Sequence, residues 1–459
     1  MSKWDRATIV EGKSIAEDGR GVTEVNGLTL YVAGLLPGER GHVEIEHRSQ
    51  HKPVAWARLI ERVGDPSPHR AEPACPAYGV CGGCAWQHLD YDCQLDEKQK
   101  RVASALQSRL SDLPEIPKPI ASEWKTGYRN KGKYVVAEVD GRLTLGAYKP
   151  RSHEVVSTLG CQVVEPTIDT TAKHVATHLK RCGIPVYSER ERTSGLRYVL
   201  LRCNSKAQVL VTIVCTSDTD TAQMQDLAGA INSFRRVCGV VRCNNNLHSG
   251  AILTSEVELL CGSLLAEETA GVTVELDSGS FWQVHRKQAA RAYQDIVSIL
   301  DLPRGSKVME LYAGMGGIAF ALAKQGLQVA AVEQDVQAVD AATRAAHNAG
   351  LTNVEFYHAD ATTMQTEDFE GIAAVVVDPP RKGLGKRGVN QLCEAKVAKI
   401  AYLSCGPESL AKDLEQLVAA GYEVAQLKLY DFMPGTAQVE VLALLVLSTP
   451  PAQDAHPAQ

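Results

Sequence analysis

Residues 307–333, KVMELYAGMGGIAFALAKQGLQVAAVE, decide the fold of the C-terminal half of this chain. The short apolar run 307–311 is typical of a buried strand, and the glycine-rich residues 312–317 predict a turn. A helix follows in the pattern, and a second apolar run, 328–333, predicts a strand that ends in an acid. This order of elements is typical of the nucleotide-binding half of an open α/β sheet.

The glycine-rich turn predicts a binding site for a nucleoside. Glycines such as Gly314 and Gly317 let the backbone approach a ligand closely. Glu333, which ends the second strand, can accept hydrogen bonds from ribose hydroxyls. NAD would also fit this arrangement, but the glycines do not follow the GxGxxG pattern. S-adenosylmethionine fits the pattern better.

The next two predicted strands also end in acids. Residues 354–358 lead to Asp360, which can reach an adenine edge, and residues 373–377 lead to Asp378 in the segment DPPRKG. The two prolines stiffen this loop, so we expect Asp378 to face the cleft and Arg381 to face phosphate. Methyltransferases that act on exocyclic amines carry an aromatic residue where this chain has Arg381, which argues against that chemistry.

Residues 400–409, IAYLSCGPES, place Cys405 in a turn between a predicted strand and a helix predicted over residues 408–420. Ligands bind at the carboxyl ends of strands in such sheets. The nearby helix N-terminus is expected to lower the pKa of the Cys405 thiol. Position alone leaves two interpretations open, a buried structural cysteine and a nucleophile.

Glu440 supplies the second part of a reaction centre. It lies one residue into the predicted last strand, 439–447, where an acid is unusual unless it is functional or paired. The loop before it is expected to border the same cleft as Cys405. A thiolate, a carboxylate base and a methyl donor fit methylation at carbon 5 of a pyrimidine: Cys405 adds to carbon 6, and Glu440 removes the carbon-5 proton.

The first 62 residues alternate apolar and polar positions in short runs separated by turn signals such as Val25-Asn26-Gly27. Four or five short strands at this spacing predict a small antiparallel barrel. Barrels of this kind often bind single-stranded nucleic acid, and a scaffold domain is the alternative.

A cysteine-rich loop follows in CPAYGVCGGC, where Cys75, Cys81 and Cys84 have the spacing C-x5-C-x2-C. Thiolates at this spacing suit iron–sulfur or zinc ligation, which requires a fourth ligand. Cys161 is the preferred candidate because it lies in a loop after a strand, whereas Cys93 begins a predicted helix. Spacing alone leaves cluster and zinc open.

Between residues 123 and 151 seven basic residues stand against three acids, which predicts a local basic surface. Arg129 and Lys131 belong to this group. Tyr128, Tyr134 and Tyr148 are interleaved with it and are expected to stack on unpaired RNA bases. A solvated strand face is the alternative.

Composition sets the outer limits of these predictions. The chain has 459 residues, a net charge of −6, and hydrophobic and charged contents of 44% and 22%, which are typical of a globular protein. No apolar run is long enough to span a membrane, and the first residues lack the apolar region of a secretory signal. We therefore expect a cytoplasmic protein in which the 13 cysteines bind metal or catalyse rather than form disulfides.

Together these motifs resemble those of the bacterial RNA uridine-5-methyltransferases, in the iron–sulfur branch that carries an N-terminal TRAM domain. The resemblance covers nearly the whole chain. It implies a nucleophile and base at Cys405 and Glu440, and a 4Fe–4S cluster on Cys75, Cys81, Cys84 and Cys161. It also implies an S-adenosylmethionine site that uses the segment FWQVH as a strand, and the predicted site comprises Gln283, Tyr312, Gly314, Gly317, Glu333, Asp360 and Asp378.

Four positions depart from the family pattern. Gly317, Gly406 and His285 stand where asparagine is usual, and Gln438 replaces a histidine two residues before the base. Since nucleophile and base are intact, an active enzyme is still predicted. The departures bear on the RNA target and on cofactor contacts.

The sequence therefore predicts an α/β protein of three domains. Residues 1–62 form a TRAM-like, OB-like β-barrel that binds RNA, residues 63–270 a central α+β domain with the cluster loop, and residues 271–459 a Rossmann-like class I methyltransferase domain. The predicted activity of this monomer is methylation of carbon 5 of a uridine in structured RNA, ribosomal RNA before tRNA, with Arg129, Lys131 and Arg381 on the RNA. The alternatives are an RNA cytosine-5 methyltransferase and a non-catalytic RNA-binding protein or chaperone with a vestigial pocket.

Overall fold

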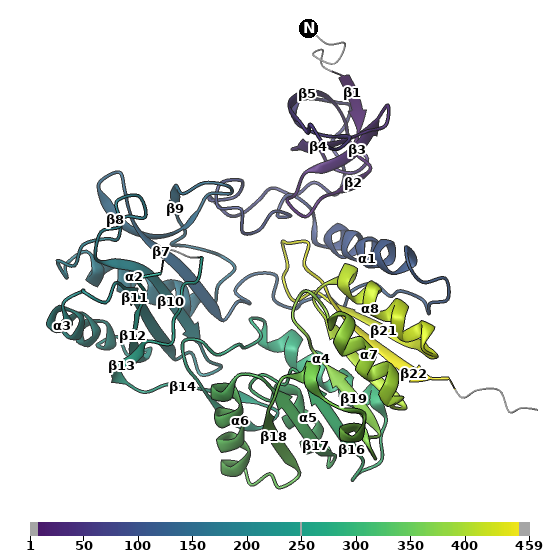
Figure 1. Cartoon of the computed structure of the whole chain (residues 1–459). Coiled ribbons are helices and arrows are strands. Elements are labelled where there is room, and N and C mark those ends of the chain that lie inside the picture. The colour runs from purple at the N-terminus through teal and green to yellow at the C-terminus, as the bar shows by residue number, and fades with distance from the viewer. Residues whose placement is uncertain (1–7, 248–249, 449–459) are drawn as a thin grey trace, which may run out of the picture.

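The computed structural model describes residues 8–247 and 250–448, which form three large sheets and one separate hairpin (Figure 1). The N-terminal sheet stands apart at one end, the central sheet lies to one side, and the C-terminal sheet with its helices forms the largest unit (Figure 1). Within the described ranges no helix is both long enough and apolar enough to cross a membrane.

The N-terminal sheet has six strands in the order β1-β5-β6-β4-β3-β2. Its strands are β1 (Thr8–Glu11), β2 (Ser14–Ile15), β3 (Gly21–Val25), β4 (Leu28–Ala33), β5 (Arg40–Arg48) and β6 (Val54–Val63). The prediction of a purely antiparallel arrangement is wrong, because β6 inserts between β4 and β5 and runs parallel to β4. The core is small and apolar, and it includes Val32, Leu35 and Ala55.

Residues 64–90, which contain three of the predicted cysteine ligands, form no regular element. Helix α1 (Tyr91–Gln107) follows and begins where the Asp90 carboxylate accepts the backbone N–H of Cys93. Although α1 precedes the central sheet in sequence, it packs beside α8 of the C-terminal unit, and Val102 and Leu106 enter the core there (Figure 1). The following segment joins the same unit, since the Ile120 N–H donates to Leu429 of β21.

The central sheet has seven strands in the order β13-β12-β11-β10-β7-β8-β9. Its strands are β7 (Lys131–Val139), β8 (Arg142–Tyr148), β9 (Val155–Ser157), β10 (Leu196–Cys203), β11 (Val209–Cys215), β12 (Val237–Asn244) and β13 (Val257–Gly262). Helices α2 (Pro166–Leu179) and α3 (Thr221–Asn232) pack together on one face, and every residue of β10 and β11 is buried. Residues 252–253 pack on the other face.

A short hairpin and a helix lead into the C-terminal unit. The hairpin strands β14 (Leu265–Thr269) and β15 (Val272–Leu276) contribute Leu265, Val272 and Leu276 to the C-terminal core. Helix α4 (Arg286–Leu300) follows and packs against α5.

The C-terminal sheet has the order β18-β17-β16-β19-β20-β22-β21, in which the first five strands are parallel and β22 is antiparallel to both neighbours. Its strands are β16 (Lys307–Leu311), β17 (Gln328–Glu333), β18 (Val354–His358), β19 (Ala374–Val377), β20 (Lys399–Ser404), β21 (Tyr422–Tyr430) and β22 (Glu440–Leu447). The connecting helices are α5 (Gly317–Lys324), α6 (Val336–Asn348), α7 (Gly385–Ala395) and α8 (Pro407–Ala419), with two 3₁₀ turns, η1 (Ala361–Thr363) and η2 (Thr366–Phe369).

This sheet confirms the predicted α/β class. The strand order reverses between β16 and β19, and a crevice at the carboxyl ends of these strands is where such sheets bind ligands. The acids predicted from the sequence all lie on this edge. Glu333, Asp360 and Asp378 lie at or after the ends of parallel strands, whereas Glu440 lies at the beginning of β22, which runs in the opposite direction.

Candidate active site

The turn after β16 brings the backbone close to the end of β17. Tyr312, Gly314 and Gly316 take positive φ angles of 65°, 53° and 82°, which lets the chain reverse into α5 within a few residues. Glu333 Oε2 accepts the backbone N–H of Gly314 at 2.8 Å, and Oε1 accepts the two N–H groups that follow it in the chain. The Glu333 carboxylate is thereby fixed beside the turn, where its remaining lone pairs can accept ribose hydroxyls.

Asp360 lies at the outer rim of the same edge. It is exposed, and its Oδ1 accepts the Thr362 N–H at 2.8 Å as the cap of η1. The structure therefore places Asp360 beyond the end of the neighbouring strand β18, with one carboxylate oxygen used to cap its own turn.

Gly317 opens α5 in contact with Tyr293 of α4. A Cβ built on Gly317 would lie 2.9 Å from Cε2 and 3.0 Å from Oη of Tyr293, closer than such contacts normally come. Tyr293 also lies near Glu310, Asp378 and Glu440, whose charges add to the effect of burial in raising its pKa. The glycine is required because Tyr293 fills the space that a side chain at position 317 would take.

Three acids lie close enough for their charges to interact: Glu310 in β16, Asp378 after β19 and Glu440 at the start of β22. Burial raises the pKa of Asp378 to about 7, although the Gln283 amide donates to its carboxylate at 3.4 Å. Burial, followed by the charge of Asp378, raises the pKa values of Glu310 and Glu440 well above the usual range. Acids with pKa values displaced towards neutrality are common at reaction centres.

Cys405 lies next to Glu440 across two paired strands. Ser404, the last residue of β20, pairs with Val441 of β22, so the residues that follow Ser404 and precede Val441 are neighbours at the sheet edge. Cys405 is partly buried there, in the turn before α8. The sequence-predicted nucleophile and base are therefore brought together.

The prediction of a lowered thiol pKa at Cys405 is wrong. Burial raises the pKa to about 11, and the charges of Glu440 and Asp378 raise it further, while only the guanidinium of Arg381 and a backbone hydrogen bond oppose them. The N-terminus of α8 lies beside the thiol, as predicted, but desolvation and two carboxyl groups outweigh the field of one helix end. The thiol is therefore protonated in the free protein at neutral pH.

Arg381 and Gln438 contact each other beside Cys405 and Glu440. The Arg381 guanidinium donates to Gln438 Oε1 at 3.4 Å, and its positive charge acts on both Cys405 and Glu440. Arg381 is exposed, so a bound polyanion can contact it. Gly406, beside the thiol, has no room for a side chain, because a Cβ there would lie 2.6 Å from Ser409 Oγ and 2.9 Å from the Arg381 carbonyl oxygen.

The segment 281–285, FWQVH, is an extended loop and not the predicted strand. Its backbone is held by Asn130, whose side chain donates to the Gln283 carbonyl and whose N–H donates to that of Val284, each at 3.0 Å. His285 is fully buried, caps α4 by accepting the Gln288 N–H at Nδ1, and donates from Nε2 to Ser122 Oγ at 2.7 Å; burial lowers its pKa to about 4. It therefore stays neutral and serves as a helix cap.

Sequence reasoning missed three residues at this centre. Phe281 is 70% exposed, the most exposed of the large apolar side chains described, and it lies two residues from Gln283. Nothing in a single sequence separates such a phenyl ring from a core residue. Glu310 could have been found, since an acid inside an apolar strand is the signal that identified Glu440, whereas Tyr293 carries no local signal.

The four predicted cysteine ligands line one large cleft. Cys75, Cys81, Cys84 and Cys161 all face it, and Gln162 joins their two segments by donating to the Ala74 carbonyl at 3.1 Å. Burial, then the charges of the other thiols, raises the pKa of Cys84 to about 11 and raises that of Cys81. Cys93 lies instead in a small apolar cluster with Trp86 and Leu89.

This donor set fits a metal centre in its chemistry. Four thiols share one pocket, and their mutual charges oppose ionisation, which a bound cation would reverse. Across residues 8–247 and 250–448, however, no three His, Cys, Asp or Glu side chains approach one another in the arrangement of a metal site. The structure thus brings the four cysteines to one place but does not show them in a coordination sphere.

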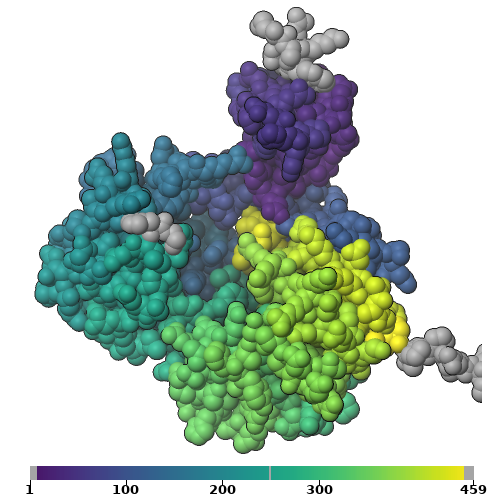
Figure 2. All heavy atoms as spheres, in the orientation of Figure 1, coloured from purple at the N-terminus to yellow at the C-terminus, as the bar shows by residue number. Residues whose placement is uncertain are grey.

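The same cleft, of about 1630 Å³, extends from the N-terminal sheet past the cysteines to residues 433–438, between β21 and β22. Figure 2 shows the molecule hollowed between the N-terminal sheet, the central sheet and the C-terminal unit. Seven basic residues line the cleft against three acids, and the basic ones are Arg20, Arg70, Arg129, Lys131, Lys133, Lys149 and Arg151. At its far end the cleft reaches Gln438, which links it to Arg381.

The prediction that Tyr128 and Tyr134 stack on RNA bases is wrong. Tyr128 is 1% exposed and stacks on His285, and Tyr134 is 2% exposed in the central core. Both alternate with basic residues in sequence, but the strand alternation that exposes the basic residues turns the tyrosines inward. Tyr148 is only partly buried.

Comparisons with known proteins agree with this geometry. The family described as tRNA (Uracil-5-)-methyltransferase matches residues 269–447. An RNA methyltransferase of Bacillus cereus is 31% identical over 95% of this chain and 96% of its own length, and one of Nostoc is 30% identical over 97% and 98%. The fold also matches that of the Pyrococcus abyssi tRNA (uracil-54, C5)-methyltransferase in complex with S-adenosyl-L-homocysteine, with a TM-score of 0.77 and 24% identity over 96% of this chain and 100% of that one.

The bacterial relatives match across nearly their full lengths, so the similarity includes the N-terminal and central units as well as the C-terminal sheet. The chain belongs to the RNA methyltransferase family of these bacterial relatives, and its residues 269–447 match the tRNA (Uracil-5-)-methyltransferase model.

Proposed function

We propose that this enzyme transfers the methyl group of S-adenosylmethionine to carbon 5 of a uridine in structured RNA, with Cys405 as nucleophile and Glu440 as base. The observation that carries the proposal is the pairing of β20 with β22, which sets Cys405 beside Glu440 at the sheet edge where the predicted cofactor ligands of the strand ends also lie. The predicted cofactor ligands are Gln283, Tyr312, Gly314, Gly317, Glu333, Asp360 and Asp378.

Carbon 5 of uracil is a weak nucleophile and must be activated. The Cys405 thiolate adds to carbon 6, and the electron pair of the 5,6 double bond moves towards the carbonyl at carbon 4 to give an enolate. Carbon 5 of this enolate attacks the methyl group, and S-adenosylhomocysteine leaves. Glu440 then takes the carbon-5 proton, the double bond re-forms, and the bond between sulfur and carbon 6 breaks to release Cys405.

The electrostatics of the pocket suit this order of proton transfers. The raised pKa of Cys405 means that the thiol must pass its proton to a neighbour as it attacks, and Asp378, whose charge acts on Cys405 and whose pKa is about 7, can exchange one. The raised pKa of Glu440 makes the Glu440 carboxylate a stronger base once it is ionised. Arg381 favours the ionised form of both Cys405 and Glu440.

We further propose that RNA binds along the large cleft, with Arg129, Lys131 and Arg381 on its phosphates and the N-terminal sheet at its far end. Phe281, exposed beside Gln283, offers a face on which the target base can stack. The basic excess along the cleft within an acidic chain supports this path, because phosphate contacts supply most of the affinity for nucleic acid.

Lys131 makes this proposal testable by pH. Burial, then the charges of Arg202, Arg129 and Lys133, lowers the pKa of Lys131 to about 8. RNA prefers the charged form, so we expect affinity to fall by up to about tenfold as pH rises from 8 to 9, where the lysine loses its proton. Lys131→Arg, which stays charged, should abolish the fall, and filter binding of a tRNA transcript at fixed salt measures it.

A matched control separates local from general effects on RNA affinity. Lys173 on α2 is exposed, pairs with Asp169 and is not among the residues that line the cleft, so Lys173→Met should bind RNA with the wild-type pH dependence. If the Lys131→Arg variant loses affinity with pH as steeply as the wild type, Lys131 is not a phosphate ligand.

We propose that Cys75, Cys81, Cys84 and Cys161 hold a 4Fe–4S cluster that fixes the loop beside the RNA cleft. Protein purified without oxygen should be brown and contain about four iron atoms per chain. Cys161→Ser should lose the iron, whereas Cys93→Ser, whose thiol lies in the apolar cluster, should keep it. A colourless preparation with one zinc ion per chain would contradict the cluster.

The target RNA and base are decided by one experiment. RNA from cells with and without the gene is digested to nucleosides, and 5-methyluridine and 5-methylcytidine are measured by mass spectrometry separately for ribosomal RNA and tRNA. We expect loss of 5-methyluridine from ribosomal RNA, on the resemblance of the cysteine motif, and the match to a tRNA uracil-54 enzyme makes tRNA the second candidate. Loss of 5-methylcytidine would support the cytosine alternative. No change in either nucleoside would support the alternative of a non-catalytic RNA-binding protein.

A further inference from the structure

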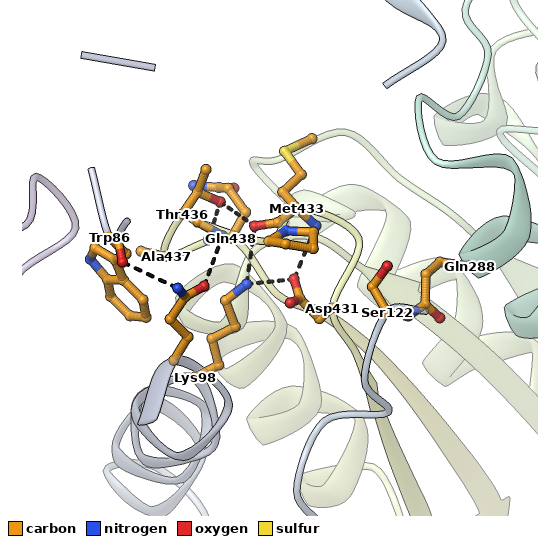
Figure 3. A network of polar contacts seen from close by, with 12 residues as sticks. Trp86, Lys98, Ser122, Gln288, Asp431, Met433, Thr436, Ala437 and Gln438 are labelled. Carbon is orange, nitrogen blue, oxygen red and sulfur yellow. Dashed lines mark hydrogen bonds and ion pairs between the residues drawn. The ribbon is translucent and has the colours of Figure 1, made fainter. Parts of the chain in front are cut away.

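Residues 431–439, here called the β21–β22 loop, connect the two antiparallel strands of the C-terminal sheet and end at Glu440. One side of the loop faces the large cleft through Met433, Thr436, Ala437 and Gln438. The other side lies against α1, a helix that belongs to a distant part of the sequence (Figure 3). The loop therefore stands between the RNA path and the catalytic edge.

A buried ion pair fixes the start of this loop. Lys98 of α1 points at Asp431, with Nζ 2.5 Å from Oδ1, and both side chains are completely buried (Figure 3). The same ammonium donates to the Met433 carbonyl at 3.2 Å, and Asp431 Oδ1 accepts the Met433 N–H at 3.1 Å. One charged pair thus holds both the N–H and the carbonyl group of one loop residue.

Neighbouring residues extend the clamp along the loop. Gln94, one turn before Lys98, accepts the Gly435 N–H at 2.8 Å, and the Gly435 carbonyl accepts the Trp86 N–H at 2.9 Å. Arg101, nearly one turn after Lys98, donates to the Ala437 carbonyl at 3.0 Å and pairs with Glu408 in the first turn after Cys405. Contacts with α1 therefore run from the start of the loop to within three residues of Glu440.

The energetics argue that this pair does more than stabilise the fold. Removing two charges from water costs about as much as their attraction returns, so a buried ion pair is a weak source of stability compared with apolar residues of similar volume. Its directional hydrogen bonds do fix the loop backbone in one position. Gln438, at the end of the clamped stretch, contacts Arg381, which acts on both Cys405 and Glu440.

We propose that Lys98 is a positioning residue for proton abstraction: with Asp431 and the neighbouring Arg101 it fixes the β21–β22 loop so that Gln438 and Glu440 face Cys405. The proposal rests on the proposed role of Glu440 as the base. This role also gives a reason for the packing of α1 on the C-terminal unit, although α1 follows the cysteine loop in the sequence. A Cβ built on Gly435 would lie 3.6 Å from Cβ of Cys84, so the cysteine loop lies against the same part of the β21–β22 loop.

The test uses two independent variants of the full-length enzyme. Lys98→Met/Asp431→Leu removes both charges, so no buried charge is left unpaired. Arg101→Met removes the contact with the Ala437 carbonyl and leaves two exposed acids, Glu17 and Glu408, without their Arg101 partner. Lys118→Met is the matched control, because Lys118 lies after α1 and its substitution breaks only an exposed ion pair with Asp96 of α1.

We expect the double variant to bind S-adenosylmethionine and RNA as the wild type does, with turnover reduced about 10²-fold, as expected for a misplaced catalytic group. Arg101→Met should lower kcat in the same direction without raising KM. In both variants the covalent RNA–protein complex should accumulate, because proton removal and release of Cys405 become slow, while addition of the thiolate does not depend on Glu440. Lys118→Met should match the wild type.

The outcomes separate this proposal from the one on which it rests. If either folded variant turns over within about threefold of the wild type and accumulates no complex, Lys98 and Arg101 are only structural and the inference is overturned. If Glu440→Gln, measured in parallel, neither slows turnover nor accumulates the complex, the base assignment itself fails. If the double variant does not fold, Arg101→Met decides the question.

Discussion

Cys405→Ala is expected to abolish methyl transfer, with turnover lowered by on the order of 10⁴-fold or more, because the reaction has no alternative route to activate carbon 5 once the sulfur is lost. Binding of S-adenosylmethionine should be unchanged, since the predicted cofactor ligands lie in the turns after β16, β17, β18 and β19 and in the loop before α4. Transfer of radiolabelled methyl to RNA measures turnover, and calorimetry measures cofactor binding.

The control for this variant is Cys393→Ala. Cys393 is also a free, partly buried cysteine of the C-terminal unit, but it lies on α7 and contacts the carbonyl of Gln416. Its replacement should leave turnover close to that of the wild type. If Cys405→Ala retained turnover within about tenfold, a mechanism without covalent addition would have to replace the one proposed.

Glu440→Gln is expected to lower turnover by about 10³-fold, in the range found for removal of a general base. The addition of Cys405 and methyl transfer come before proton removal, so methylated RNA should remain attached to the protein as a complex that survives denaturing electrophoresis. Glu423→Gln, on the exposed side of β21, is the control and should give neither effect.

The same substitution has a distinct effect on stability. The pKa of Glu440 is raised well above its unfolded value, so folding holds the acid in its neutral form, and this costs free energy that grows as pH rises above the unfolded pKa. Glutamine has no such cost. Glu440→Gln should therefore unfold at a higher denaturant concentration than the wild type at pH 8 and at nearly the same concentration at pH 4. Lower stability at pH 8 would show that the carboxylate is paired in the folded state.

The C-terminal sheet was predictable because its signals are local. Each parallel strand is a short apolar run, and each turn that follows it carries a glycine, a proline or an acid. The positions of Glu333, Asp378 and Cys405 at one edge follow from strand polarity alone. Glu440 was predictable for a different reason, since an acid in an apolar strand is rarely without a role.

The features that were not predictable depend on contacts between distant segments. The pKa of Cys405 was predicted in the wrong direction because the helix end is local, whereas Asp378 and Glu440 come from other strands. Burial of Tyr128 and Tyr134 depends on packing against His285 and the central core. The parallel pairing of β4 with β6 depends on the path of β5.

The clamp on the β21–β22 loop is the clearest example of such a contact. Lys98 and Asp431 are 333 residues apart, and neither stands out in its own segment. In sequence α1 is an ordinary polar helix with two lysines, and only the fold shows that one of them is completely buried against an aspartate. The glycine at position 317 is likewise explained only by the fold, which places the Tyr293 ring where a side chain at 317 would lie.

The central claim is that Cys405 adds to carbon 6 of the uracil ring, and a single trapping measurement tests it most directly. Target RNA transcribed with 5-fluorouridine is incubated with the enzyme and S-adenosylmethionine; fluorine replaces the proton that Glu440 must remove, so elimination cannot follow methyl transfer. After digestion, mass spectrometry should find the peptide that contains Cys405 carrying a methylated fluorouridine nucleotide. Attachment at another cysteine, or no attachment under conditions where uridine RNA is methylated, would contradict the account.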